Sequence, residues 1–94
     1  MINVMSQDDK LVPVTATILE LPFGITGILH RPVDSRDDDA WVVSEYQSGH
    51  RLCRVRGDSE HAVEKAKNII MGAGEENVRE VIGKVLEQFG CANR

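Results

Sequence analysis

The chain has 94 residues, 41% hydrophobic and 28% charged, a composition typical of one small globular domain. No apolar run reaches the roughly 18–20 residues that a membrane-spanning helix needs, and the first residues do not resemble a signal peptide. We therefore expect a cytoplasmic protein without a membrane partner. The net charge of −4 disfavours general nucleic-acid binding and favours docking onto a basic surface.

The N-terminal part of the chain predicts a lead-in followed by a strand. Residues 1–10 show no hydrophobic periodicity, so we expect a flexible segment there and a single domain over residues 11–94. The run 11–21 is rich in Val, Thr, Ile and Leu, which predicts a strand. Pro13 predicts either an edge strand or the first residues of a strand, because proline cannot donate a hydrogen bond to a neighbouring strand.

A turn and a second strand follow. The Pro-Phe-Gly sequence of residues 22–24 is typical of a turn, and residues 26–31 predict the second strand of a hairpin. Residues 33–40 hold turn-forming and charged residues without apolar periodicity, so we expect a solvated loop.

The clearest hairpin signal lies between residues 41 and 56. Two β-rich segments, 41–46 and 51–56, flank Ser48 and Gly49, which suit a two-residue primed turn. That turn sets a register. One face would pair Tyr46 with Arg51, Ser44 with Cys53, and Val42 with Val55. The other, half-exposed face would pair Glu45 with Leu52, Val43 with Arg54, and Trp41 with Arg56.

Two helices close the chain. Asp58 or Ser59 supplies the capping oxygen of a helix whose apolar residues keep helical spacing up to a break at residues 72–74. Two glutamates at 75–76 open a second helix that ends before Gly90. Strands followed by helices predict an α+β fold: an antiparallel sheet of about four strands in two hairpins, then two helices that cover one face.

No motif for catalysis stands out. His50 and Cys53 would point to opposite faces of a strand, whereas His61 and Glu64 share a helix face but lack a third metal ligand. The glycines of residues 72–74 follow a helix and lack the lysine of a phosphate-binding loop. We therefore expect no enzyme, no cofactor and no metal site, and we expect both cysteines to stay reduced.

The charged residues offer two candidate partner-binding surfaces. One is an acidic loop whose carboxylates imitate phosphate charge and would pair with the Lys and Arg of a nucleic-acid groove; a solvated acidic turn is the alternative. Its residues are Asp34, Asp37, Asp38 and Asp39. The other is the outer sheet face, with Trp41, Glu45, Arg54 and Arg56. The tryptophan and arginines there suit contact with a nucleic-acid strand, a cation–π contact of Trp41 under Arg56, or simple burial of Trp41.

Residues 41–70 resemble the strand–turn–strand–helix unit of HicB-type antitoxins. The likeness is carried by the sequence Gly57-Asp58-Ser59-Glu60-His61-Ala62, which follows a strand, and by Ala66 in the helix. The resemblance implies a regulatory module that binds a small toxin or forms a homodimer.

In size, charge and architecture, the whole chain is similar to small accessory proteins of phages and mobile elements, anti-CRISPR inhibitors among them. That likeness implies a non-enzymatic protein that binds and occludes a protein partner with a basic surface, as an inhibitor of a bacterial defence complex does. The sequence leaves two alternatives open. One is the antitoxin-like module, and the other is a nucleic-acid binder that uses Trp41, Arg51, Arg54 and Arg56.

Overall fold

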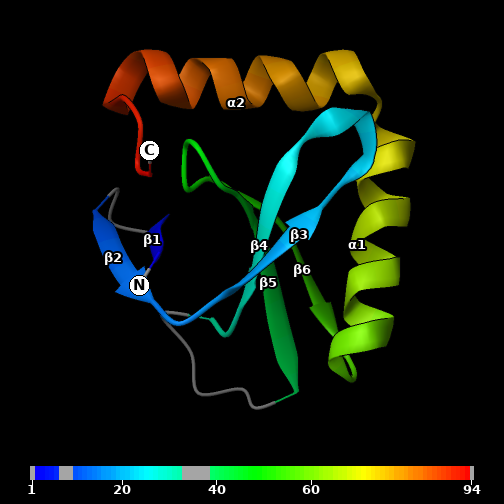
Figure 1. Cartoon of the computed structure of the whole chain (residues 1–94). Coiled ribbons are helices and arrows are strands. Elements are labelled where there is room, and N and C mark those ends of the chain that lie inside the picture. The colour runs from blue at the N-terminus through cyan, green and yellow to red at the C-terminus, as the bar shows by residue number, and fades with distance from the viewer. Residues whose placement is uncertain (1, 7–9, 33–38, 94) are drawn as a thin grey trace.

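A computed structural model describes residues 2–6, 10–32 and 39–93 of the chain (Figure 1). Six strands, a short 3-10 turn and two helices lie within these residues. In chain order they are β1 (Ile2–Met5), β2 (Leu11–Val14), β3 (Thr17–Glu20), η1 (Pro22–Gly24), β4 (Thr26–His30), β5 (Ala40–Glu45), β6 (Arg51–Arg56), α1 (Ser59–Ala73) and α2 (Glu75–Phe89).

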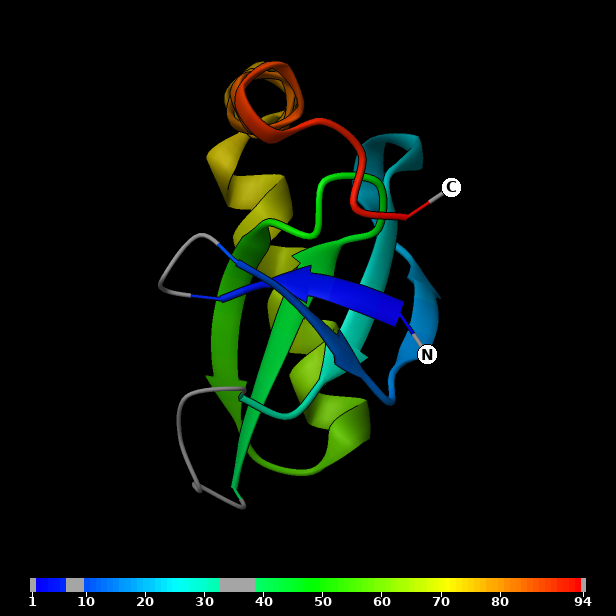
Figure 2. The same ribbon diagram turned by 90° about the vertical axis from the view of Figure 1, so that its left-hand side faces the viewer.

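The main sheet is an antiparallel meander in the order β3-β4-β5-β6, and it is followed by the two helices. This arrangement confirms the α+β fold class and the two predicted hairpins. β1 and β2 form a separate antiparallel pair. In Figure 2 this small hairpin crosses one face of the main sheet, and α1 lies behind the other face.

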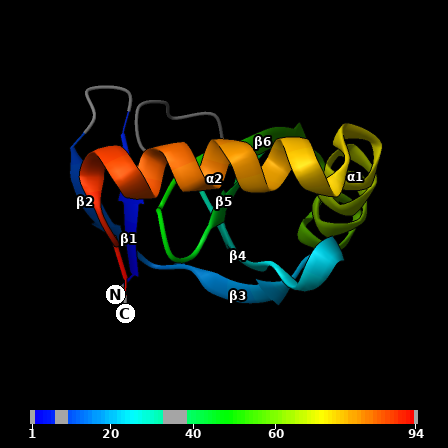
Figure 3. The same cartoon turned by 90° about the horizontal axis from the view of Figure 1, so that it is seen from above.

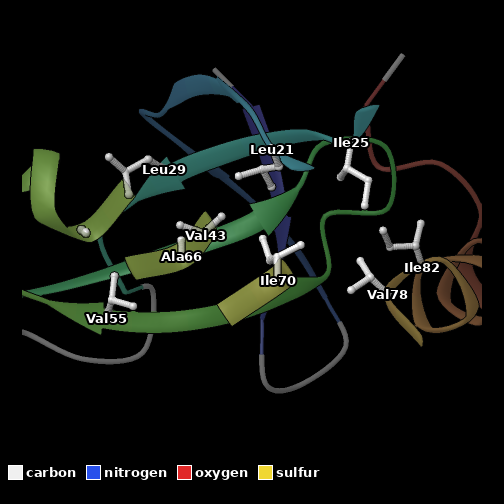
Figure 4. Close-up of a cluster of buried hydrophobic side chains, with 10 residues drawn as sticks. Leu21, Ile25, Leu29, Val43, Val55, Ala66, Ile70, Val78 and Ile82 are labelled. Atoms are coloured by element: carbon white, nitrogen blue, oxygen red, sulfur yellow. The ribbon is translucent and has the colours of Figure 1, made fainter. Parts of the chain in front are cut away.

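The core on the helical side is built from apolar residues of the sheet and of one stripe on each helix. Helix α1 contributes Ala62, Ala66 and Ile70, which recur every four residues and so line one side of the helix. Figure 4 shows Ala66 and Ile70 beside residues of the sheet, and the α2 residues Val78 and Ile82 next to Ile25. The full buried cluster is Leu21, Ile25, Leu29, Val43, Val55, Ala62, Ala66, Ile70, Val78 and Ile82. Each large aliphatic side chain among them contributes about 1.5–3 kcal/mol by leaving water.

The opposite face of the sheet is also covered. Ile28 and Val42 alternate with the core residues Leu29 and Val43, so they point to the other side, yet Ile28 is fully buried and Val42 is 4% exposed. Val4 of β1 is fully buried as well. The β1–β2 hairpin therefore packs on this face.

Two expectations about the N-terminal strands are corrected. Residues 2–5 belong to a strand and not to a flexible lead-in, because Ile2 and Val4 pair with two valines of β2. The predicted strand over residues 11–21 is interrupted at residues 15–16, so that β2 joins the small sheet and β3 the main one. Of the two positions predicted for Pro13, the edge strand is confirmed, because β2 pairs with β1 alone.

The turn between β5 and β6 is wider than predicted. The backbone N–H of Glu45 donates to the carbonyl of His50 at 2.8 Å, and that of Gly49 donates to the carbonyl of Glu45 at 2.8 Å. Four residues, 46–49, therefore form the connection, and the predicted two-residue turn is wrong. The side chain of Glu45 accounts for the difference, since its carboxylate accepts hydrogen bonds from the backbone N–H groups of Gln47 and Ser48.

The register of β5 and β6 is also one residue away from the predicted one. Trp41 pairs with Val55, and Val42 pairs with Arg54. Nearer the turn the register shifts between Val43 and Ser44, which is the signature of a β-bulge. A one-residue slip reverses the faces of β5 relative to β6. Trp41 and Val43 therefore share a face with Val55, and all three belong to or pack against the core on the helical side of the sheet.

The predicted start of α1 and end of α2 are confirmed, whereas α1 continues through Gly72 and Ala73 and breaks only at Gly74. Asp58 caps α1, and its Oδ1 accepts a hydrogen bond from the backbone N–H of His61 at 2.9 Å. Gly90 follows α2 with φ 78°, a conformation that favours glycine. Over the part of the chain that the structure describes, neither helix combines the length and apolar character that crossing a bilayer would require.

Candidate interaction surfaces

The acidic segment, defined as residues 34–39, connects β4 to β5. Asp34, Asp37 and Asp38 lie outside the described residues. Asp39 is exposed directly before β5, and its backbone carbonyl accepts a hydrogen bond from the N–H of Gly57 at 3.1 Å. This bond ties the end of the segment to the residue that follows β6.

Trp41 and Arg31 lie on either side of the same segment in the chain and contact each other. The guanidinium carbon of Arg31 is 3.7 Å from the centroid of the Trp41 ring, a cation–π distance. Arg31 also donates to the carbonyl of Ala40 at 3.0 Å, and the indole N–H of Trp41 donates to that of Gly57 at 3.2 Å. The cation over Trp41 is thus Arg31, where the sequence suggested Arg56.

The predicted grouping of Trp41 with two arginines on one sheet face does not form. Trp41 is half-buried and packs against the helical-side core, whereas Arg54 and Arg56 pair with Val42 and Ala40, whose side chains point to the opposite face. The register slip explains this separation.

Three arginines of β6 do share a face. At the bulge, Leu52 and Cys53 both pack against the helical-side core, and Arg51 pairs with Ser44. Arg51 therefore points to the same side as Arg54 and Arg56, and all three are exposed. Sequence reasoning set Arg51 on the other face, because an uninterrupted strand alternates strictly. We name Arg51, Arg54 and Arg56 the arginine row.

Glu45 lies apart from both surfaces. It is 5% exposed, and its two carboxylate oxygens accept the backbone N–H groups of Gln47 and Ser48, the latter at 2.8 Å. The carboxylate is thus used to shape the turn. We leave Glu45 out of the interaction surface.

A pocket of about 360 Å³ opens between the turns at the end of the sheet, helix α2 and the C-terminal segment. It is lined by Gly24, Ile25, Thr26, Glu45, Tyr46, Gln47, Arg79, Ile82 and Asn93. The two charged side chains of the lining, Glu45 and Arg79, form hydrogen bonds to other groups of the same chain. Glu45 holds the turn, and Arg79 donates to the carbonyl of Phe23 and, at 3.3 Å, to the carboxylate of Glu75. We assign no ligand to this pocket.

His30 and Ser44 form a buried polar pair that sequence reasoning missed. His30 Nε2 lies 2.8 Å from Ser44 Oγ, and His30 Nδ1 lies 2.8 Å from the carbonyl oxygen of Arg31. Because a carbonyl only accepts, Nδ1 carries the proton and Nε2 accepts from the serine hydroxyl. Burial lowers the pKa of His30, which favours this neutral form.

A histidine bonded to a serine is the arrangement that activates a nucleophile. Here His30 is 3% exposed and Ser44 is 1% exposed, so a substrate has no access to the hydroxyl. A backbone carbonyl, not a carboxylate, orients the ring. The hydrogen bond between His30 and Ser44 gives each of these buried polar side chains a partner beneath the β1–β2 hairpin.

The described residues contain no group of three or more His, Cys, Asp or Glu side chains placed to hold a metal ion. His61 is instead bonded through Nδ1 to Asp58 Oδ2 at 2.8 Å. Hydrogen bonds from the backbone N–H and side chain of His61 lower the pKa of Asp58, so the exposed pair completes the helix cap.

Comparison with protein-family models, with curated proteins and with solved structures finds no match to this chain. The placement of its charged side chains therefore carries the functional argument.

Proposed function

We propose that this chain is a non-enzymatic interaction protein that docks its acidic segment onto a basic surface of a protein partner and occludes that surface. The observation that carries the proposal is that the described residues beside the segment are held by the fold. Arg31, three positions before the segment, contacts Trp41 and donates to the carbonyl of Ala40. The carbonyl of Asp39, the last residue of the segment, accepts from the N–H of Gly57. Such anchors lower the conformational entropy that the chain loses on binding.

The charge of the segment suits a cationic partner. Four carboxylates stand against one guanidinium, that of Arg36, within residues 34–39. Grouped carboxylates are attracted to grooves lined with Lys and Arg, and such grooves bind phosphate groups in nucleic-acid-handling complexes. A chain of this size seated in such a groove would exclude nucleic acid by steric overlap. Inhibition of a bacterial defence complex is the biological role that this mechanism would serve.

The proposal is tested by capture with the tagged chain from the lysate of a bacterium with an active CRISPR system. The variant Asp34→Asn/Asp37→Asn/Asp38→Asn/Asp39→Asn removes four charges from the segment. The matched control is Glu60→Gln/Glu64→Gln/Glu76→Gln/Glu87→Gln, which removes four charges from exposed helix positions.

We expect the wild-type chain and the control to retain one stoichiometric nucleic-acid-handling complex. The aspartate variant should capture about tenfold less of this complex, because the substitutions remove complementary charge at the contact. Equal capture by the two variants would contradict the proposal, and recovery of a small basic toxin would favour the antitoxin alternative.

A second candidate function rests on the arginine row. Three exposed guanidinium groups on one side of β6 are a suitable contact for phosphates of a single nucleic-acid strand. The chain's net charge of −4 opposes it. Binding of a fluorescent single-stranded oligonucleotide should then weaken with salt and with Arg51→Ala/Arg54→Ala/Arg56→Ala. The control Lys67→Ala/Arg79→Ala/Lys84→Ala removes equal charge, and equal loss in both variants would contradict a specific role.

A further inference from the structure

The two edges of the four-stranded sheet differ in their protection. β6 forms one edge, and it carries the arginine row, a bulge and a neighbouring helix. Lys65 of α1 also donates from Nζ to the carbonyl of Arg56 at 3.0 Å. Charged side chains, bulges and covering helices are the usual means by which proteins prevent pairing at a sheet edge.

β3 forms the other edge and has few of these features. Its sequence is Thr-Ile-Leu-Glu, without a basic residue or a proline, and three of its four residues are exposed. Ile18 is 58% exposed, although its partner Ile28 on β4 is fully buried. Figure 3 shows β3 at the outer margin of the molecule, away from both helices.

The hydrogen-bonding phase of β3 follows from the hairpin that it forms with β4. The N–H of Leu21 donates to the carbonyl of Ile25 at 2.8 Å, so this pair is hydrogen-bonded. Pairs alternate along an antiparallel ladder, and Leu19 and Thr17 therefore also bond to β4. The N–H and C=O groups of Ile18 and Glu20 consequently point outward, to the side where the sheet as described has no further strand.

We propose that β3 pairs with β3 of a second copy of this chain, antiparallel and about a two-fold axis at Ile18. In this register the outward N–H and C=O groups of Ile18 bond to the same groups of the second copy. The two Ile18 side chains then meet on one face of a continuous sheet. Glu20 lies opposite Ala16 of the second copy, so no two glutamates oppose each other.

The second copy is favoured over a foreign strand because β3 is self-complementary in this register. Pairing of β3 with β6 of another copy would build an open filament, but the protected β6 edge disfavours it. Between the two edges of the four-stranded sheet, β3 with β3 is the favoured pairing, and that contact is two-fold and closes at the dimer. The proposed dimer uses no residue of the acidic segment, because that segment connects β4 to β5 and β3 lies elsewhere in the chain.

Four-residue strands make a small interface, below the roughly 1,200 Å² of a typical stable complex. The dimer should therefore exchange with the monomer and depend on concentration. Sedimentation velocity over a range of concentrations up to the millimolar level measures this equilibrium directly.

The first test compares the wild-type chain with Ile18→Lys, which places a charge at the centre of the interface. The control is Met71→Lys, which alters a side chain of similar exposure (61%) on α1. We expect reversible dimerisation of the wild type and the control, and dimerisation weakened about tenfold or more in Ile18→Lys. A wild-type chain that stays monomeric throughout, or equal dimerisation of the two variants, would overturn the proposal.

The second test fixes the register by oxidative cross-linking in a Cys53→Ser/Cys91→Ser background. Ile18→Cys places two cysteines directly opposite, at about 5.5 Å between Cα atoms, which permits a disulfide. Glu20→Cys would place the two Cα atoms about 14 Å apart and serves as the control. Covalent dimer is expected from Ile18→Cys alone; efficient cross-linking through position 20, or none through position 18, would contradict the two-fold at Ile18.

Discussion

Asn3 and Asn93 hold each other by reciprocal hydrogen bonds although 90 positions separate them. The N–H of Asn3 donates to Asn93 Oδ1 at 2.9 Å, and Asn93 Nδ2 donates to the carbonyl of Asn3 at 2.8 Å. The same Nδ2 donates to the carbonyl of Tyr46 at 2.8 Å. One amide side chain therefore joins β1, the turn after β5 and the C-terminal segment.

Removal of this amide should loosen all three segments. Asn93→Ala leaves the backbone groups of Asn3 and Tyr46 without their partner, and we expect a loss of about 2 kcal/mol in the free energy of unfolding. Urea denaturation measures it. Asn68→Ala, at an exposed site on α1, is the control and should change stability by less than about 0.5 kcal/mol. Equal effects of the two substitutions would contradict the joining role of Asn93.

Two glycine-to-alanine substitutions should act in opposite directions. Gly49 has φ +71°, and a Cβ there would lie 3.1 Å from the backbone nitrogen of Met5. Gly49→Ala should cost at least about 1–2 kcal/mol from the left-handed backbone alone. Gly83 lies within α2 with nothing within 4 Å of an added Cβ, so Gly83→Ala should stabilise the chain by up to about 1 kcal/mol. Thermal melts of both variants test this, and a destabilised Gly83→Ala would contradict the open surroundings of that site.

Stability should decrease as pH falls from about 7.5 toward 5, because burial lowers the pKa of His30 below its ordinary value of 6.5. Below that pH the unfolded chain binds a proton that the folded chain excludes. The stabilisation from neutral His30 is therefore complete above pH 6.5 and is lost as the pH falls through the folded-state pKa. Burial and the charge of Arg51 lower the pKa of His50 in the same direction.

Urea titrations at several pH values separate the two histidines. The decline should be reduced in His50→Gln and should disappear in the double variant His30→Gln/His50→Gln. His61→Gln is the control, because it replaces an exposed histidine and leaves His30 and His50 in place, so the decline should persist. Wild-type stability that is constant over this range would count against a neutral, buried His30.

The Arg31–Trp41 contact should be visible in fluorescence, because Trp41 is the single tryptophan of the chain. Arg31→Ala uncovers one face of the indole ring, so its emission should shift to longer wavelength, with a loss of about 0.5–1 kcal/mol in stability. Arg31→Lys retains a cation and should give a smaller change. Arg51→Ala, on β6, should leave the emission unchanged; an unaltered spectrum in Arg31→Ala would refute the contact.

The helices and the two hairpins of the main sheet were predictable from sequence because their signals are local. Asp58 marks a helix start through its side-chain oxygen and Gly90 marks a helix end through its backbone conformation, and the Pro-Phe-Gly turn of residues 22–24 needs no tertiary information. These residues act through groups that lie within a few positions of them in the chain.

The register and the face assignments were not predictable, because they depend on side chains that act across the fold. The carboxylate of Glu45 widens the turn, and Leu52 packs against the core at the bulge. Neither feature can be predicted from strict alternation of polar and apolar residues. β1 escaped prediction because a four-residue strand has too few positions to show periodicity, and its cover over the sheet depends on distant partners such as Asn93. As a result, the arginine row appeared only in the structure.

Occlusion by the acidic segment predicts that this chain and nucleic acid compete for the captured complex. The fraction of chain that stays bound is followed as a single-stranded oligonucleotide is added. The oligonucleotide should displace the wild-type chain and the helix-glutamate control with equal midpoints, and it should displace the segment variant with four asparagines at about tenfold lower concentration. A chain that remains bound at saturating oligonucleotide, or a segment variant that competes as the wild type does, would contradict occlusion by the acidic segment.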